Sequence, residues 1–261
     1  METRLIGCAV RGPGLPDWPT VAAILNGRTR HVAQPSVEPA PTMLPPNERR
    51  RLPNLARWAL VAGHDALAAA GCAGADIATV FASCGSDGKI THQICEALAT
   101  PAGDVSPTRF HNSVHNAPAG YWSIAMASSA PSNSLCAGAG SFGAALLEAA
   151  AQSVVEARPV LLIAYDLPYP EPLRSVWPIA DQFAVGMLLA VSNDAAAGLL
   201  MRMKLSAEAP TSAWPQQLPS ELAANPAAAA LPLLALVASG AAGSVVLPYL
   251  DRCSIHVEVG A

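Results

Sequence analysis

Short segments rich in apolar residues alternate along the chain with longer segments in which apolar residues recur every three or four positions. The short segments predict strands over residues 4–10, 75–84, 132–137, 159–165, 184–191, 199–205, 244–247 and 254–259. The continuous apolar run at 159–165 is typical of a strand buried on both faces of a sheet. The helical period predicts helices over 19–26, 54–70, from the turn at 85–88 to about 99, 121–127, 138–156 and 218–239. Strands that alternate with helices indicate an α/β fold with a mixed central sheet flanked by helices.

The segments between these elements read as turns and loops. Residues 31–47 hold five prolines and predict an extended surface segment, and residues 106–116 predict a further loop. Asn193-Asp194 is typical of a turn between two strands. No internal repeat or boundary is visible, so residues 1–261 are expected to form a single domain.

The composition is apolar, with 52% hydrophobic and only 13% charged residues. So few charges favour a chain that buries a large interface, although a GC-rich coding sequence would raise the alanine content in the same way. The net charge is −4 and the 15 basic residues are spread along the chain. A nucleic-acid-binding protein would carry a basic stripe, so we exclude that class.

Cysteine spacing and apolar runs indicate whether the chain holds a metal, a disulfide scaffold or a membrane span. The six cysteines form no Cys-x-x-Cys pair, which argues against a metal site or a disulfide scaffold, and no motif indicates a cofactor. The uncharged stretch between Glu221 and Asp251 contains Pro226, Pro232 and Pro248, so a buried helix and a strand are expected there rather than a membrane span. With nothing at Met1–Cys8 that resembles a signal peptide, the cytoplasm is the expected compartment.

One segment carries a family resemblance. From Ser106 to Glu148 the chain reads SPTRFHNSVHNAPAGYWSIAMASSAPSNSLCAGAGSFGAALLE. This order of a Ser-Pro loop, an Ala-Gly helix, a Pro-Ser turn, a strand, a tight elbow and a long helix resembles the β-ketoacyl synthases. The likeness extends roughly from Arg4 to Leu205. It implies a thiolase-like fold that corresponds to the N-terminal ketosynthase half, with the C-terminal catalytic half absent.

Two shorter stretches resemble a particular group within that family. Residues 113–120 and 134–138 are similar to the chain length factors of aryl polyene and related pigment synthases. The resemblance implies a non-catalytic subunit that heterodimerises with a full-length β-ketoacyl-ACP synthase in polyene or fatty-acid-like polyketide biosynthesis and shapes its acyl tunnel. An acyl carrier protein is then expected to act through the complex. A homodimeric scaffold without a synthase partner is the weaker alternative.

The position of the family's nucleophile decides whether the chain is expected to catalyse condensation. An alignment without gaps, from Ala119-Gly120 to Pro131-Ser132, puts that position on Ala139, whose methyl group can neither attack nor leave. Cys136 lies three residues earlier and is expected to be a small buried thiol inside the strand, because an odd shift sends a side chain to the opposite face of a sheet. The alternative is a cysteine-dependent acyltransferase or thioesterase that uses Cys136.

The histidines point the same way. The resemblance implies a catalytic pair in His-Gly-Thr-Gly-Thr and Gly-Phe-Gly-Gly-His motifs, and this chain has neither; His256 is its only histidine beyond His115.

Residues 106–120 match the part of the family that lies at the dimer interface. By position, Arg109, Phe110, His111 and Asn112 are expected at the end of the partner's acyl tunnel, and His115 and Asn116 are expected to support the interface. For His111 and His115 a purely structural, hydrogen-bonded role remains an equal alternative. The basic cluster of Arg49, Arg50, Arg51 and Arg57 fits the exposed start of a helix better than a surface for an acidic carrier protein.

Overall fold

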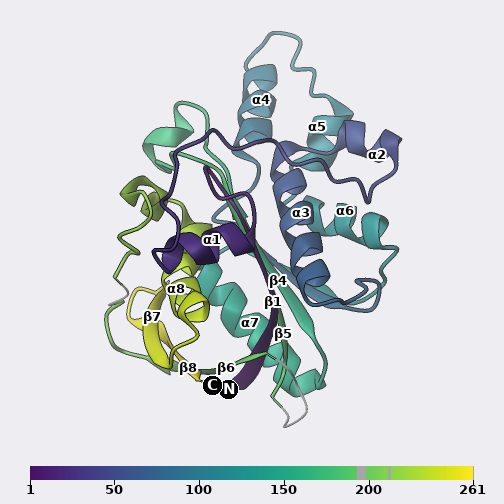
Figure 1. The fold of residues 1–261 in the computed structure, drawn as a ribbon. Coiled ribbons are helices and arrows are strands. Elements are labelled where there is room, and N and C mark those ends of the chain that lie inside the picture. The colour runs from purple at the N-terminus through teal and green to yellow at the C-terminus, as the bar shows by residue number, and fades with distance from the viewer. Residues whose placement is uncertain (193–197, 211–212, 261) are drawn as a thin grey trace.

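A single eight-stranded sheet runs through the computed structural model, which describes residues 1–192, 198–210 and 213–260 (Figure 1). The strand order is β3-β2-β4-β5-β1-β6-β8-β7. The strands are β1 (Glu2–Arg11), β2 (Ala78–Ala82), β3 (Ser132–Leu135), β4 (Val160–Asp166), β5 (Phe183–Val191), β6 (Leu199–Ser206), β7 (Gly243–Leu250) and β8 (Cys253–Gly260). Strand β2 pairs in parallel with β3 and β4, and the other neighbouring pairs are antiparallel. The mixed sheet predicted from the apolar runs is therefore confirmed.

Helices cover both faces of this sheet. The α-helices are α1 (Trp18–Leu25), α2 (Pro46–Arg51), α3 (Asn54–Ala69), α4 (Gly88–Leu98), α5 (Pro107–Asn112), α6 (Ala117–Met126), α7 (Ser141–Glu156) and α8 (Leu231–Ser239). Short 3₁₀ helices are η1 (Gly138–Gly140), η2 (Leu173–Ser175), η3 (Ser220–Ala224) and η4 (Pro226–Ala230). Helix α3 lies on one face of the sheet and α7 on the other (Figure 1).

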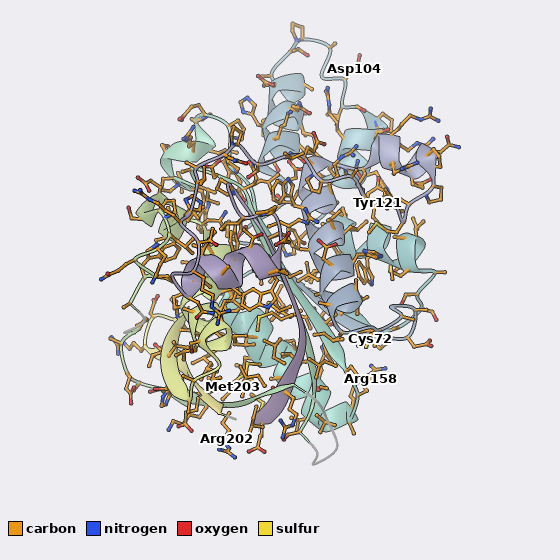
Figure 2. All side chains as sticks on the ribbon, in the orientation of Figure 1. Cys72, Asp104, Tyr121, Arg158, Arg202 and Met203 are labelled. Carbon is orange, nitrogen blue, oxygen red and sulfur yellow. The ribbon has the colours of Figure 1, made fainter. Side chains whose placement is uncertain are left out.

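The alternation of side chains along the central strands divides the core in two. Phe81 of β2 packs with Trp122 and Tyr165 on the side of α3 and α6. Val80 and Ala82 of the same strand point to the opposite side, into the cluster beneath α1, α7 and α8. Side chains fill the space between the sheet and both helix layers (Figure 2). Because β2 and β4 are covered on both faces, every one of their residues is buried.

Three parts of the sequence prediction differ from the structure. The predicted loop at 106–116 contains the short helix α5. Residues 31–45 hold neither helix nor strand, as expected, but the short helix α2, which was not predicted, begins at Pro46. The predicted helix at 218–239 is divided into η3, η4 and α8, because Pro226 begins a new turn after Asn225, whose backbone is extended. The predicted turn at Asn193-Asp194 lies outside the described residues.

In the described part of the chain, no helix is both long and apolar enough to cross a membrane.

Candidate functional site

The elbow between β3 and α7 has the geometry expected from the sequence. Strand β3 ends at Leu135, and the chain turns through Gly138, whose φ of 55° is in the left-handed region that favours glycine. The buried Ser141 hydroxyl holds this turn together, because it accepts a 3.0 Å hydrogen bond from the Ala137 N–H and lies 2.7 Å from the Gly138 carbonyl oxygen. Ala139 is exposed at this elbow, one turn before the body of α7. The side chain exposed at this elbow is therefore a methyl group, which cannot act as a nucleophile.

The prediction that Cys136 is a buried strand thiol is wrong. Strand β3 ends one residue before Cys136, whose side chain is exposed, with its Sγ 3.1 Å from the carbonyl oxygen of Cys84. The strand is shorter than its apolar pattern indicates because the chain bends toward the elbow directly after Leu135. A labelling reagent would therefore reach Cys136 whether or not the thiol has a function.

A buried carboxylate that the sequence analysis missed ties the elbow region to the rest of the sheet. Asp166, the last residue of β4, accepts hydrogen bonds from the Ser83 hydroxyl (2.8 Å), the Cys84 N–H (2.8 Å) and the Ala227 N–H (3.1 Å). Burial raises the pKa of this carboxyl to about 6, although its hydrogen bonds act in the opposite direction. An aspartate at the end of an apolar strand is the only sequence signal for it.

Tyr169 closes the space above the start of α4. Its hydroxyl donates to the Ser86 carbonyl oxygen at 3.2 Å and lies 3.8 Å from the Cys84 Sγ. A Cβ added at Gly88 would overlap the Tyr169 ring, so the glycine is needed for this close packing. Burial raises the pKa of the Cys84 thiol, which keeps it protonated and unreactive.

Helix α5 separates the predicted tunnel residues onto different surfaces. Arg109 lies on a cleft against α4, whereas Phe110 and His111 lie on a groove against α6. Asn112 is buried between them: its amide donates to the Arg51 carbonyl oxygen at 2.9 Å, and its oxygen accepts from the Tyr121 hydroxyl at 3.0 Å. The structure thus brings Phe110 and His111 together and gives Asn112 a structural position.

The groove between α5 and α6 is an exposed apolar surface. Its volume is about 530 Å³. It is lined by Glu48, Pro107, Phe110, His111, Val114, Asn116, Ala117, Gly120, Tyr121 and Ile124. Phe110 is 68% exposed, and Val114 and Ile124 are each more than half exposed. Large apolar side chains gathered on one surface are typical of a protein-protein contact.

The two remaining interface candidates adjoin the same groove. His115 is half-buried, and its Nε2 lies 2.8 Å from the carbonyl oxygen of Leu135, the last residue of β3. This contact fixes the start of α6 against the strand that leads to the elbow. The exposed Asn116 precedes α6 without capping it through its side chain.

The three consecutive arginines of the basic cluster lie at the end of a helix, not at a helix start as predicted. Arg49, Arg50 and Arg51 occupy the last turn of α2, where positive charge is favourable to the helix dipole, rather than a helix start. Arg57 belongs to α3 and forms an ion pair with Glu38.

A mixed sheet between helix layers, with a strand, a left-handed turn and a long helix forming an exposed elbow, defines a thiolase-like α/β protein. Residues 25–239 match the family model for the N-terminal domain of β-ketoacyl synthases. The chain therefore belongs to the β-ketoacyl synthase family.

Solved structures show the same fold. A chain from the ketosynthase ApeO in complex with its chain length factor ApeC, from Xenorhabdus doucetiae, is 22% identical with a TM-score of 0.71, over 99% of both chains. A chain of the ishigamide ketosynthase/chain length factor is 13% identical over 99% of both chains, also with a TM-score of 0.71. A chain from the AntDE:AntF complex, a type II acyl carrier protein with its ketosynthase, is 15% identical with a TM-score of 0.62, over 79% of this chain and 70% of that one. No curated protein matches the chain.

Proposed function

We propose that this chain is a non-catalytic subunit of the chain-length-factor type, which heterodimerises with a full-length β-ketoacyl-ACP synthase and shapes its acyl tunnel. The observation that carries this proposal is Ala139, which occupies an otherwise intact elbow. The elbow keeps its left-handed turn and its long following helix, so the fold of the site is retained while the nucleophile is absent. The product class would be a polyene or a related polyketide.

The surface proposed for the partner is the groove between α5 and α6. Phe110, Val114 and Ile124 expose apolar area there, and burying such side chains against a partner would contribute roughly 1.5–3 kcal/mol each. The names of the similar structures describe ketosynthases held with chain length factors, and one describes an acyl carrier protein bound to its ketosynthase. By analogy, a carrier protein would act on the complex, which needs no metal or cofactor from this chain.

The positions of the interface residues support separate roles in this proposal. Phe110 and His111 line the groove proposed for the partner and would form a wall at the end of its tunnel. Asn112 acts inside this subunit, and His115 positions α6 against β3. A packed wall stops a growing chain because protein interiors are nearly incompressible.

Co-expression with a full-length ketosynthase from the same gene neighbourhood tests the proposal, with size exclusion and mass determination as the readout. A stable one-to-one complex is expected. Phe110→Asp and Ile124→Asp should abolish it, because each places a charge in the contact. Val155→Asp is the matched control, since Val155 is 83% exposed on α7 and does not line the groove. The proposal would be refuted if the chain formed no complex with the synthase. It would also be refuted if the purified chain, without a synthase, condensed the acyl and malonyl groups of carrier proteins.

A further inference from the structure

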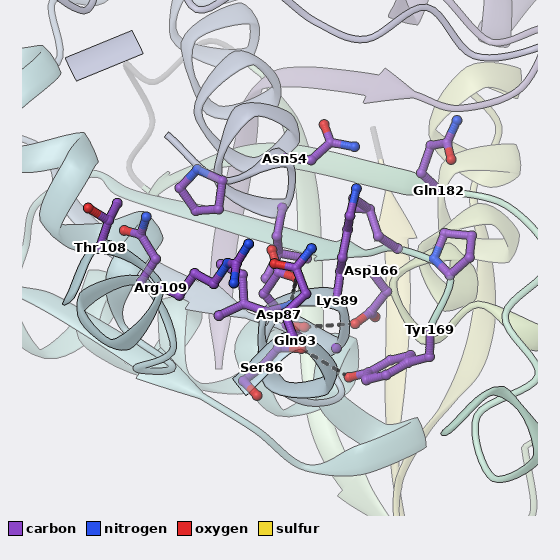
Figure 3. Close-up of a pocket in the computed structure, with 18 of the residues that line it drawn as sticks. Asn54, Ser86, Asp87, Lys89, Gln93, Thr108, Arg109, Asp166, Tyr169 and Gln182 are labelled. Carbon is purple, nitrogen blue, oxygen red and sulfur yellow. Dashed lines mark hydrogen bonds between the residues drawn. The ribbon is translucent and has the colours of Figure 1, made fainter. Parts of the chain in front are cut away.

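A second surface hollow lies on the opposite side of α5 from the groove. It has a volume of about 520 Å³, within the range of small-molecule sites. It is bounded by the ends of α2 and α5, the start of α4 and the segment that follows β4 (Figure 3). Thr108 and Arg109 lie on one side of the hollow, and Tyr169 and Gln182 on the other (Figure 3). We call it the α4–α5 cleft.

Three cationic side chains from three different helices line this cleft. They are Arg51 at the end of α2, Lys89 in the first turn of α4 and Arg109 in α5. Within residues 1–192, 198–210 and 213–260, none of the three forms an ion pair. Other arginines of this acidic chain, such as Arg11 and Arg57, do form one. Three exposed cations around one hollow give it a positive potential, which attracts an anion.

Both carboxylates that face the cleft are already engaged. Asp87 caps α4 by accepting a hydrogen bond from the Ile90 N–H at 3.1 Å. Burial raises the pKa of this carboxyl, and the charge of the neighbouring Lys89 acts in the opposite direction. Asp166 is buried at the floor, where both of its oxygens accept hydrogen bonds. The positive charge at the mouth of the cleft is therefore only partly balanced by the protein.

Neutral hydrogen-bonding side chains lie among apolar ones in the lining. Asn54, Gln93, Thr108 and Gln182 line the cleft. Amides and hydroxyls of this kind donate to oxygen atoms. The apolar residues of the lining include Pro53, Leu55, Ile90, Leu167 and Pro168. The cations, amides and hydroxyls of the lining would pair with the oxygen atoms of an anion, and the apolar residues beside them would contact its carbon skeleton.

We propose that the α4–α5 cleft binds a small polyvalent oxyanion, a phosphate or carboxylate compound, which Arg51, Lys89 and Arg109 hold by charge-assisted hydrogen bonds. Guanidinium groups match the planar edge of a carboxylate or phosphate, and lysine adds a point charge. The site is separate from the groove proposed for the synthase. It gives this subunit a ligand of its own, whether or not the chain pairs with a synthase.

Titration calorimetry of the purified full chain with sodium pyrophosphate, sodium citrate and sodium decanoate tests the inference. Pyrophosphate or citrate is expected to bind with a stoichiometry of one, and whichever is tighter identifies the phosphate or the carboxylate class. Lys89→Ala and Arg109→Ala should each weaken that binding at least tenfold, since a charge-assisted contact is lost. Arg252→Ala, a change to an exposed arginine outside the cleft, should leave it unchanged.

Three results would overturn the inference: binding of decanoate in preference to both oxyanions, equal weakening by Arg252→Ala, or no saturable binding of either oxyanion. The measurement is made on the chain without a synthase, and complex formation is read separately by size exclusion. Oxyanion binding without a complex would leave the inference standing and refute the proposed function. Complex formation without oxyanion binding would refute the inference and leave the proposed function standing.

Discussion

The Ser83 hydroxyl at the end of β2 donates a 2.8 Å hydrogen bond to the carboxylate of Asp166 at the end of β4. The two residues lie 83 positions apart and close the ends of adjacent parallel strands. The second carboxylate oxygen accepts from the Ala227 N–H, so the same side chain also fastens η4 to the sheet. Because Asp166 is buried, its ionisation is linked to folding.

The linkage gives a pH dependence of stability. The pKa of the Asp166 carboxyl is about 6 in the folded chain, above its ordinary value of 3.8, because burial disfavours the charged form. The folded state therefore binds more protons than the unfolded state between these values, and this group stabilises the fold increasingly as pH falls through 6. The contribution to the free energy of unfolding should increase by about 1 kcal/mol between pH 7.5 and pH 5.

Urea denaturation of the wild type and of Asp166→Asn at both pH values measures this contribution. The variant should be less stable at each pH, since its amide cannot accept from three donors, and the difference from wild type should be larger at pH 5. A difference that is the same at both pH values, or smaller at pH 5, would contradict the assignment.

Two glycines allow α3 to lie directly on the sheet. A Cβ at Gly7 of β1 or at Gly186 of β5 would overlap the carbonyl oxygen of Ala66 or of Ala62, respectively, and these are backbone atoms that cannot rotate away. Gly7→Ala and Gly186→Ala should each destabilise the chain by ~2 kcal/mol or more. Chemical denaturation of the two variants checks this.

Gly120→Ala is the matched control, because no atom lies within 4 Å of the added Cβ and the residue is inside α6. It should stabilise the chain by about 0.5–1 kcal/mol through helix propensity. If all three variants unfolded alike, the close packing of α3 would not be the cause.

Asn112 is predicted to act through folding rather than through the tunnel. Asn112→Ala removes a buried side chain that bridges the Arg51 carbonyl and the Tyr121 hydroxyl, and should lower the free energy of unfolding by about 1–3 kcal/mol. His111→Ala, on the exposed neighbouring residue, should change it by less than about 0.5 kcal/mol. Thermal unfolding of the free chain compares the two variants. Equal effects on the free energy of unfolding would mean that Asn112 has no special structural role.

Strand β4 was predictable from sequence because burial on both faces leaves an unbroken apolar run. All seven residues of β4 are buried, and its predicted and observed limits differ by one residue at each end. Helices α2 and α5 were not predictable in this way. Each is six residues long and starts at a proline; α2 buries none of its residues and α5 buries only Asn112, so neither has an apolar stripe.

Some features of the candidate site were likewise predictable from sequence and others were not. Spacing along one segment located the elbow and Ala139, because strand, turn and helix follow each other directly. The Asp166 network was not predictable, since its donors come from 83 residues before it and 61 residues after it in the chain. Cys136 was misplaced because β3 ends at Leu135, two residues earlier than predicted, and the Cys136 side chain is exposed rather than buried.

Ala139→Cys, introduced together with Cys136→Ala, tests the proposed nucleophile position separately from the absence of the family's histidine motifs. A thiol at residue 139 would be exposed at the N-terminal end of α7, where the helix dipole favours the thiolate. It should exchange with an acyl thioester, forming an enzyme thioester and releasing the free thiol, which intact mass spectrometry detects. It should form no carbon-carbon bond with malonyl carrier protein, because the family's histidine motifs are absent from the sequence. The single variant Cys136→Ala should remain unacylated. A condensation product from the double variant alone would mean that this chain supplies a base of its own, and the non-catalytic assignment would then fail.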